Sequence, residues 1–156
     1  MSGEEDLIKL YSQRILGLAA DIPHRSRLAE PQASVMKRSP LCGSTVTVDV
    51  SLEDGRISAF GQDVKACALG QASAAVLGEV VIGRTREEIE TARDELRAML
   101  KQNGPVPAAP FDGYEVLLPA RDYKNRHASI MLALEATLAA MDEIGARTVS
   151  DGCAGA

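Results

Sequence analysis

The chain has 156 residues, a length that fits one domain. Its residues are 46% hydrophobic and 25% charged, close to the globular average, which excludes disordered and fibrous classes. With 17 lysines and arginines against 22 aspartates and glutamates, the net charge of −5 argues against a dedicated nucleic-acid binder. No apolar run is long enough to cross a membrane. The acidic start Met1–Asp6 lacks the features of a secretory signal, so we expect a cytoplasmic protein.

The first half of the chain predicts one helix and three strands. Apolar residues at helical spacing indicate a helix over residues 5–20, and a short strand is predicted over Ala33–Lys37. The clearest strand lies at residues 45–52, where valine and leucine alternate with polar side chains. Asp54-Gly55, shortly after this strand, is a preferred pair for a two-residue type I′ turn. We therefore expect a return strand over Ile57–Ala66.

Two helices are predicted next. Residues 68–82 are small and apolar, which is typical of a buried helix. Thr85 and Glu88 have the spacing of a capping box, in which each side chain binds the other residue's backbone N–H. The helix that they start is expected to end before Asn103.

The last part of the chain is expected to hold one more helix. Residues 104–113 are rich in proline and glycine and indicate a connection. A final helix is predicted to start between residues 119 and 126 and to end at Gly145. The small and polar residues 146–156 predict a disordered tail, so the single domain is expected to span residues 1–145.

The hairpin turn also predicts which residues oppose each other. With Asp54 and Gly55 as the two turn residues, Cys42 and Cys67 fall opposite each other at the open end of the hairpin. Directly opposed Cβ atoms lie about 4.5–5.5 Å apart, near enough for two sulfurs to bind one metal ion at about 2.3 Å. The pattern therefore predicts a pair of thiols at one site.

The same register surrounds these thiols with polar side chains. It pairs Ser44 with Lys65 and Val46 with Asp63 on the face that carries the cysteines. Cys67 also precedes a predicted helix, whose free N–H groups favour a thiolate. Two close thiolates at the rim of a sheet suit ligation of a soft metal or transfer of sulfur.

Each of these residues also has a simpler interpretation. A lone cysteine is most often a small buried apolar residue, and a disulfide across the hairpin fits the spacing of Cys42 and Cys67, although a reducing compartment disfavours it. His127 taken alone fits a structural histidine near a helix start. Cys153 lies in the predicted tail.

Four segments together resemble the NifU/IscU/SufU family of iron–sulfur cluster assembly scaffolds. They occur in the family's order, over about residues 7–144, and are Ile22-Pro23-His24-Arg25, Pro40-Leu41-Cys42-Gly43, Ala66-Cys67-Ala68-Leu69-Gly70-Gln71-Ala72-Ser73, and Arg126-His127-Ala128-Ser129. The resemblance implies an α+β fold with a small antiparallel sheet of about three strands and helices packed on one face. It also implies a non-catalytic scaffold for iron or a labile iron–sulfur cluster, with zinc bound at the same place in many members.

The ligands that carry over by this resemblance are Cys42, Cys67 and His127. Ala128 stands where the family has its third cysteine, and Ser44 stands where it has an aspartate. Neither replaces what is missing, because alanine cannot ligate and serine is a poor ligand for soft metals. Ser44 and Ala128, with Asp63 and Lys65, are the expected neighbours of the site.

The resemblance further implies partners. These are a cysteine desulfurase that supplies sulfur and apoproteins that accept the cluster, with neither nucleic acid nor membrane expected. The family's chaperone-recognition segment is matched only in part, by Leu118-Pro119-Ala120-Arg121. Two alternatives stay open at this point: a zinc-binding accessory that accepts persulfide from a desulfurase, and a fold retained as a metal-free binding module.

Overall fold

The structure is a computed structural model, and it describes residues 12–40 and 43–155, with side chains up to residue 147. The elements in chain order are α2 (Gln13–Ala20), β1 (Ala33–Arg38), β2 (Thr45–Glu53), β3 (Arg56–Lys65), α3 (Ala68–Val80), α4 (Arg86–Lys101), the 3₁₀ helix η1 (Phe111–Asp122) and α5 (Lys124–Gly155). The predicted helix over residues 5–20 is described only from residue 12 onward.

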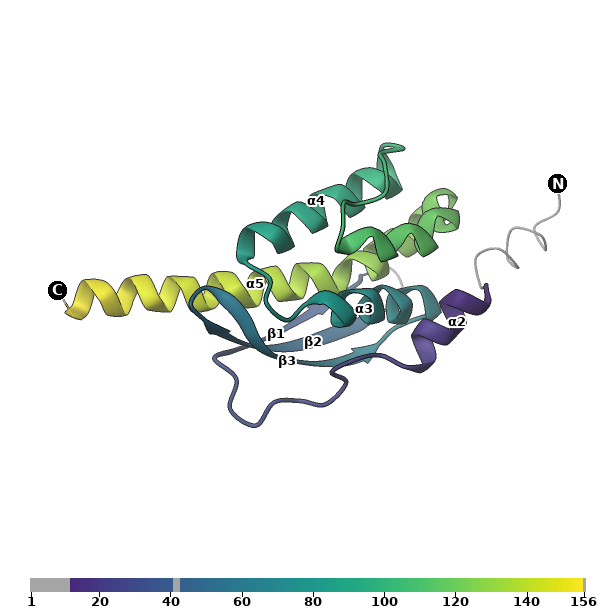
Figure 1. The fold of residues 1–156 in the computed structure, drawn as a ribbon. Coiled ribbons are helices and arrows are strands. Elements are labelled where there is room, and N and C mark those ends of the chain that lie inside the picture. Colours follow the sequence, from purple (N-terminus) through teal and green to yellow (C-terminus); the bar gives the residue numbers. More distant parts are fainter. Residues whose placement is uncertain (1–11, 41–42, 156) are drawn as a thin grey trace, which may run out of the picture.

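The three strands form one antiparallel sheet in the order β1-β2-β3. Figure 1 shows the helices gathered on one side of this sheet, with α5 running along it. Because β2 alternates, Val46, Val48 and Val50 all point to the helices and are fully buried. The expected α+β fold with a three-stranded sheet and helices on one face is confirmed.

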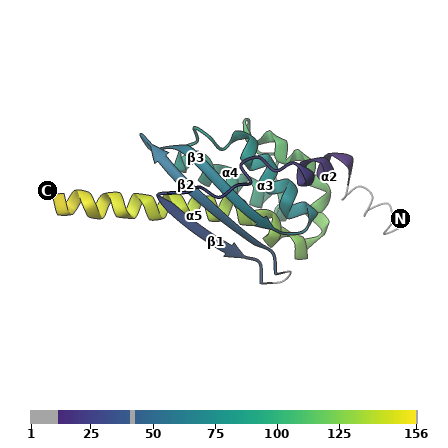
Figure 2. The same cartoon turned by 90° about the horizontal axis from the view of Figure 1, so that it is seen from below.

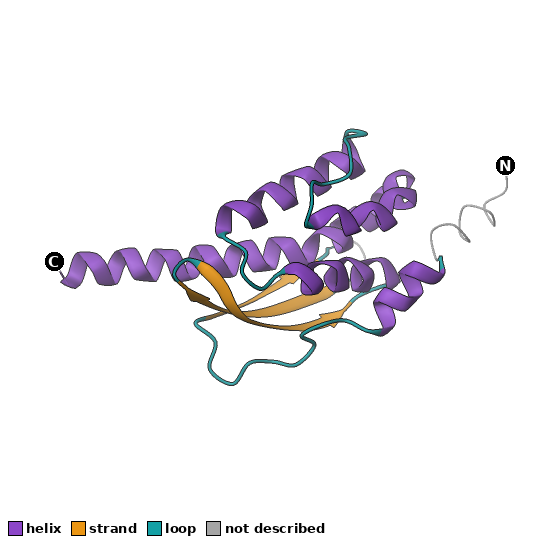
Figure 3. Ribbon diagram, in the orientation of Figure 1, coloured by secondary structure: helices purple, strands orange, loops and turns teal. Residues whose placement is uncertain are grey.

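The opposite face of the sheet is crossed by the segment between α2 and β1, as Figure 2 and Figure 3 show. Asp49 points to this face and is fully buried. It accepts hydrogen bonds from Arg27 Nε at 2.7 Å, from Arg27 Nη2 at 3.0 Å and from the Leu28 N–H at 2.9 Å, and it also contacts the Ser34 hydroxyl. Burial alone would raise the pKa of Asp49, but these hydrogen bonds together lower it.

Gly61 makes room for the same segment. A Cβ at this position would lie 2.4 Å from the Ser26 carbonyl oxygen, so a residue with any side chain would displace the segment. The Arg27–Asp49 pair and the missing side chain at Gly61 therefore hold residues 23–28 against the sheet.

The hairpin turn between β2 and β3 is confirmed, since Asp54 and Gly55 have φ angles of 54° and 77°. Thr85 and Glu88 form the predicted capping box of α4. The predicted start of the last helix is confirmed at Lys124, but its predicted end at Gly145 was wrong, because α5 continues to Gly155.

The connection predicted for residues 104–113 ends earlier than expected, because a helix that the sequence analysis did not find begins at Phe111. It is η1, a 3₁₀ helix, and its Tyr114 and Leu117 are fully buried. Its twelve residues contain Pro119 and lack the 3.6-residue period that identifies an α-helix. No helix in the described part of the chain has the length and apolar character needed to span a membrane.

Candidate functional site

Cys67 occupies the residue directly before α3, between the end of β3 and the helix start. Its backbone carbonyl accepts the N–H of Gln71 at 2.9 Å, and the Gln71 side chain donates to the carbonyl of Ala66 at 2.8 Å. These bonds fix the strand-to-helix junction. The thiol is half-buried and is not in a disulfide, so it lies at the surface of a rigid corner.

Two buried hydroxyls lie beside this thiol. Ser129 of α5 places its Oγ 3.6 Å from the Cys67 Sγ, and the same hydroxyl donates to Ser44 Oγ at 3.1 Å. Ser44 is the residue before β2 and is 4% exposed, and Ser129 is 1% exposed. The starts of β2, α3 and α5 therefore meet at Cys67, Ser129 and Ser44, a group that we call the thiol–hydroxyl cluster.

Gly70 permits this meeting. A Cβ on Gly70 would lie 2.5 Å from Ser129 Oγ and 2.8 Å from the Cβ of Ala66. The absence of a side chain at Gly70 thus lets α3 and α5 approach closely enough for Ser129 to reach Cys67.

The predicted strand register was wrong at this end of the hairpin. It holds next to the turn, where Leu52 pairs with Ile57, but a bulge between Ser51 and Leu52 shifts the pairing by one residue. Thr45 consequently opposes Lys65, and Val46 opposes Val64, in place of the predicted partners.

This shift moves two predicted neighbours of the site. Asp63 pairs with Thr47, so Asp63 and Lys65 lie on the sheet face that points away from the helices. There they are partly or largely exposed, and their charged groups lie 4.0 Å apart. The shifted register also removes the argument that placed Cys42 opposite Cys67 by strand pairing.

Cys42 lies outside the described residues. The segment that contains it is bounded by Ser39 and Ser44, where the Ser39 N–H donates to the Ser44 carbonyl at 2.8 Å. Gly43, the residue before Ser44, has a φ of 70°, a conformation that glycine adopts without strain. Since Ser44 is two residues from Cys42 and belongs to the thiol–hydroxyl cluster, the segment ends beside Cys67.

His127 is buried at the start of α5, with 1% of its surface exposed. Its Nε2 lies 2.9 Å from the carbonyl oxygen of Ala120 and 3.1 Å from that of Arg121. Because carbonyls only accept, Nε2 carries a proton, and Nδ1 is the ring nitrogen that these hydrogen bonds do not use. The ring thus fastens α5 to η1. Ala128, the next residue, is half-buried.

The described residues alone do not complete a metal site. Among them, which exclude Cys42, no three histidine, cysteine, aspartate or glutamate side chains gather closely enough to hold a metal ion. They supply one half-buried thiol, Cys67, at a rigid corner, and one hydroxyl, that of Ser129, 3.6 Å from its sulfur.

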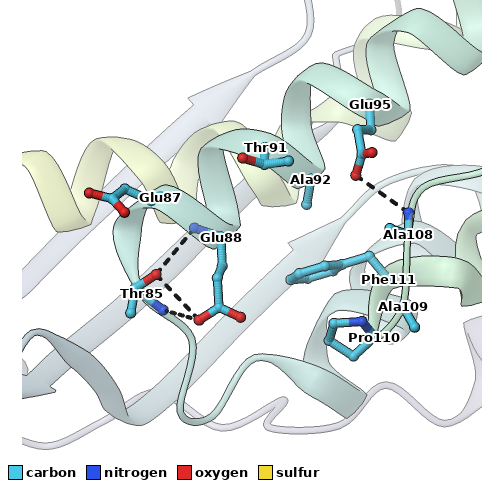
Figure 4. A pocket seen from close by; sticks show the side chains of 10 residues that line it. All are labelled: Thr85, Glu87, Glu88, Thr91, Ala92, Glu95, Ala108, Ala109, Pro110 and Phe111. Carbon is cyan, nitrogen blue, oxygen red and sulfur yellow. Dashed lines mark hydrogen bonds between the residues drawn. The ribbon is translucent and has the colours of Figure 1, made fainter.

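A separate cavity of about 250 Å³ lies between α4 and the loop before η1 (Figure 4). Two of its acidic side chains, Glu88 and Glu95, already have structural roles. Glu88 accepts from the Thr85 N–H at 3.1 Å and from Arg84 at 2.9 Å, and Glu95 faces the N–H of Ala108 at 3.4 Å. The backbone hydrogen bond from Thr85 lowers the pKa of Glu88. This cavity shares no residue with the thiol–hydroxyl cluster.

Comparison with known proteins places this chain in a family. The model of the NifU-like N terminal domain matches residues 10–149. The chain belongs to this family. The crystal structure of a nitrogen-fixing NifU-like protein (N-terminal) from Brucella abortus is 44% identical, covers 90% of this chain and 97% of that one, and has a TM-score of 0.87.

Two further similarities of this NifU-like chain are more distant. The iron–sulfur cluster assembly scaffold protein IscU of Thermotoga maritima is 29% identical over 90 residues, which are 58% of this chain and 63% of the relative's length. A putative SUF-system scaffold from Fervidobacterium islandicum shares the fold, with a TM-score of 0.76 at 18% identity over 86% of this chain and 98% of that one.

Ser129 is the site residue that the sequence analysis missed. It stands directly after Ala128 in the segment that resembles the third-cysteine helix. Helical geometry separates neighbouring residues by about 100°, so Ala128 and Ser129 cannot face the same point. The sequence signal that could have identified Ser129 was its position next to the residue that replaces the missing cysteine.

Proposed function

We propose that this chain is a scaffold that holds an iron–sulfur cluster, or iron on the way to one, through Cys42 and Cys67. The observation that carries the proposal is the thiol–hydroxyl cluster, in which Ser129 joins Cys67 to Ser44, two residues from Cys42. Membership of the NifU-like family and the IscU relative support it. The iron–sulfur cluster is cargo in this proposal, and the protein performs no catalysis of its own.

The donor set explains why such cargo would be released readily. Thiolates are the usual ligands of iron–sulfur clusters, and four of them are usual in a stable site. This chain offers two cysteines as ligands in this proposal, Cys42 and Cys67, and has an alanine at position 128. An incomplete ligand set leaves a position open to an incoming sulfur or to a ligand of the receiving protein.

We assign the third ligand position to His127. Its Nε2 donates to backbone carbonyls, which is the arrangement that usually orients a metal-ligating histidine through its other nitrogen. The nitrogen left for iron is Nδ1. In this proposal a cysteine desulfurase supplies the sulfur and apoproteins in the cytoplasm receive the cluster.

The test is anaerobic reconstitution of the purified protein with iron and sulfide. We expect sulfur-to-iron charge-transfer absorbance that is lost in Cys42→Ala and Cys67→Ala and kept in the control Cys153→Ala. His127→Gln keeps a side-chain N–H donor and removes the imidazole, so weaker retention of iron in this variant would support its role as a ligand. A protein that stays colourless and binds no iron would contradict the proposal.

Two other outcomes have a specific meaning. Tightly held zinc, with a desulfurase that turns over faster in the presence of this protein, would favour a sulfur-transfer accessory. Equal thermal stability with and without iron or zinc would favour a metal-free binding module, because a ligand that binds the folded state must stabilise it.

A further inference from the structure

The two edges of the sheet differ in what covers them. At the β3 edge, the N–H of Ile57 donates to the Arg84 carbonyl at 3.0 Å. Further along the same edge, the N–H of Gln62 donates to the His24 carbonyl at 2.8 Å. β1 forms the other edge, because the strand order is β1-β2-β3, and Figure 2 shows no described helix or strand beyond it. The β3 edge is therefore covered by two crossing segments, and the β1 edge is open in the described part of the chain.

The backbone of β1 presents a row of hydrogen-bonding groups along this open edge. The Ser39 N–H donates to the Ser44 carbonyl at 2.8 Å, in continuation of the register between β1 and β2. Alternate residues of an edge strand direct their N–H and C=O groups toward the paired strand and away from it. Those of Ser34, Met36 and Arg38 consequently point outward, where they can pair with a further strand.

The side chains of β1 combine apolar and cationic groups. Met36 is 61% exposed. Lys37 and Arg38 are exposed as well, and neither forms an ion pair with any of the described residues. Because side chains alternate along a strand, Met36 and Arg38 lie on the outer face, and Val35 and Lys37 lie on the face that carries the helices. On each face, a strand added at this edge meets one apolar and one cationic side chain.

The two charges indicate which kind of strand fits. Positive side chains on an edge strand prevent pairing with another copy of the same edge. Two β1 strands side by side would bring Lys37 and Arg38 of both chains into one small joint, where like charges repel each other. An acidic strand is attracted by the same two side chains, so charge complementarity favours an acidic partner over a second copy.

We propose that the β1 edge from Ser34 to Arg38 binds an acidic, extended segment of a partner protein, which joins the sheet as a fourth strand antiparallel to β1. Hydrogen bonds between the main chains supply affinity, and side chains on alternate faces supply specificity, as in other strand additions. Opposite Arg38, Lys37, Met36 and Val35 in turn, the segment carries two acidic residues followed by two apolar ones.

This docking position lies beside the segment that contains Cys42. β1 ends at Arg38, and the next residue, Ser39, binds the carbonyl of Ser44 in the thiol–hydroxyl cluster. The acidic end of the docked segment, opposite Arg38, is the end closer to that cluster. A partner held at β1 is thus held near the thiols, although its binding does not require iron.

The test uses the capped hexapeptide Thr-Glu-Glu-Val-Val-Thr with the full chain, in calorimetry and amide NMR. We expect shifts centred on residues 34–38, with slower hydrogen exchange of the outward N–H groups of β1. Affinity should fall at least tenfold in K37E/R38E and stay unchanged in the control R14E/K101E, which reverses two exposed charges on α2 and α4. Equal losses in the two variants, or a peptide that does not bind the parent chain, would overturn the proposal.

Two N-methylated peptides separate strand addition from general charge attraction. Both keep the side chains and charge of the hexapeptide, and they carry methyl groups on opposite alternate sets of amides, which removes those N–H donors. Because one set of amides faces β1 and the other faces away, one peptide should bind the parent chain at least tenfold more weakly than the other. Equal affinity of the two would overturn the proposal. This measurement does not depend on the folding of any variant.

Self-association and the iron site are tested separately. A parent chain that forms dimers which are lost in K37E/R38E would show that a second copy occupies the edge, and this would overturn the assignment to an acidic partner. Cys67→Ala should bind the hexapeptide as the parent chain does, so the docking edge and the proposed iron site can fail independently.

Discussion

Two polar groups on opposite sides of the sheet, Asp49 and Cys67, differ in how many hydrogen-bond partners they have. Asp49, under the segment that crosses the outer face, is buried and accepts hydrogen bonds from Arg27, Leu28 and Ser34. Cys67, at the helix side, is half-buried, and within the described residues its sulfur has one hydroxyl contact, at 3.6 Å. A polar group with all its partners stabilises a fold, whereas one with few partners is available to bind something else.

Removing the satisfied group should have the largest effect on stability. Asp49→Ala leaves the Leu28 N–H and the Ser34 hydroxyl without their acceptor, and we expect a loss of about 3 kcal/mol in the free energy of unfolding. The control Asp63→Ala changes a partly exposed aspartate of β3 and should alter stability by less than about 0.5 kcal/mol. Denaturant unfolding measures both. Similar losses in the two variants would show that the Asp49 network does not hold the outer face.

The pH dependence of stability provides a second test of this group. Because the pKa of Asp49 is lowered in the folded state, its contribution is present above the ordinary carboxyl pKa of about 4 and is lost as the pH falls through the lowered value. The stability difference between the parent and Asp49→Asn should therefore be constant from about pH 5 to 7 and shrink below about pH 4. A difference that grows on acidification would contradict this assignment.

The next largest effect is expected where the outer segment touches the sheet. Gly61→Ala forces a Cβ against the Ser26 carbonyl and should cost about 1–3 kcal/mol. Gly17→Ala is the matched control, since a Cβ at this exposed position of α2 meets nothing within 4 Å. Alanine in a helix should stabilise the chain there by up to about 1 kcal/mol. Thermal unfolding of both variants checks the opposite signs.

The smallest effect on stability is expected at the thiol–hydroxyl cluster. Ser129→Ala removes one hydrogen bond to Ser44 and should cost about 1 kcal/mol. Its effect on the reconstituted cluster should be more visible. When Cys67 is a ligating thiolate, the Ser129 hydroxyl, 3.6 Å from the sulfur, can turn its one proton from Ser44 to that sulfur, and such a hydrogen bond shifts the reduction potential of the iron. Ser58→Ala, an exposed serine that donates to the Ser51 carbonyl, is the control. Unchanged potential in Ser129→Ala would exclude contact between this hydroxyl and the ligand sulfur.

Local chemistry made much of the fold predictable. The alternation of Val46, Val48 and Val50 identified the central strand, Asp54-Gly55 identified the turn, and Thr85 with Glu88 identified the start of α4. Each signal comes from residues that are adjacent or one helical turn apart. The Cys67 position at a helix start followed from the same kind of signal.

What could not be predicted depends on contacts between distant segments. The bulge beside Ser51 is independent of the turn residues, and it moved Lys65 and Asp63 to the other face of the sheet. The helix does not end at Gly145, because a glycine costs a helix only about 1 kcal/mol. Beyond Gly145, Arg147 forms an ion pair with Glu143 and donates to the Gln32 carbonyl, and these contacts stabilise the continued helix.

Iron and acid-labile sulfide content, measured on protein purified without oxygen, tests the central claim most directly. The parent chain should carry both elements, Cys67→Ala should carry neither, and Ala128→Cys should keep its iron longer against a chelator than the parent because it gains a thiolate. Equal iron and sulfide in the parent and in Cys67→Ala would contradict the assignment of this thiol as a cluster ligand.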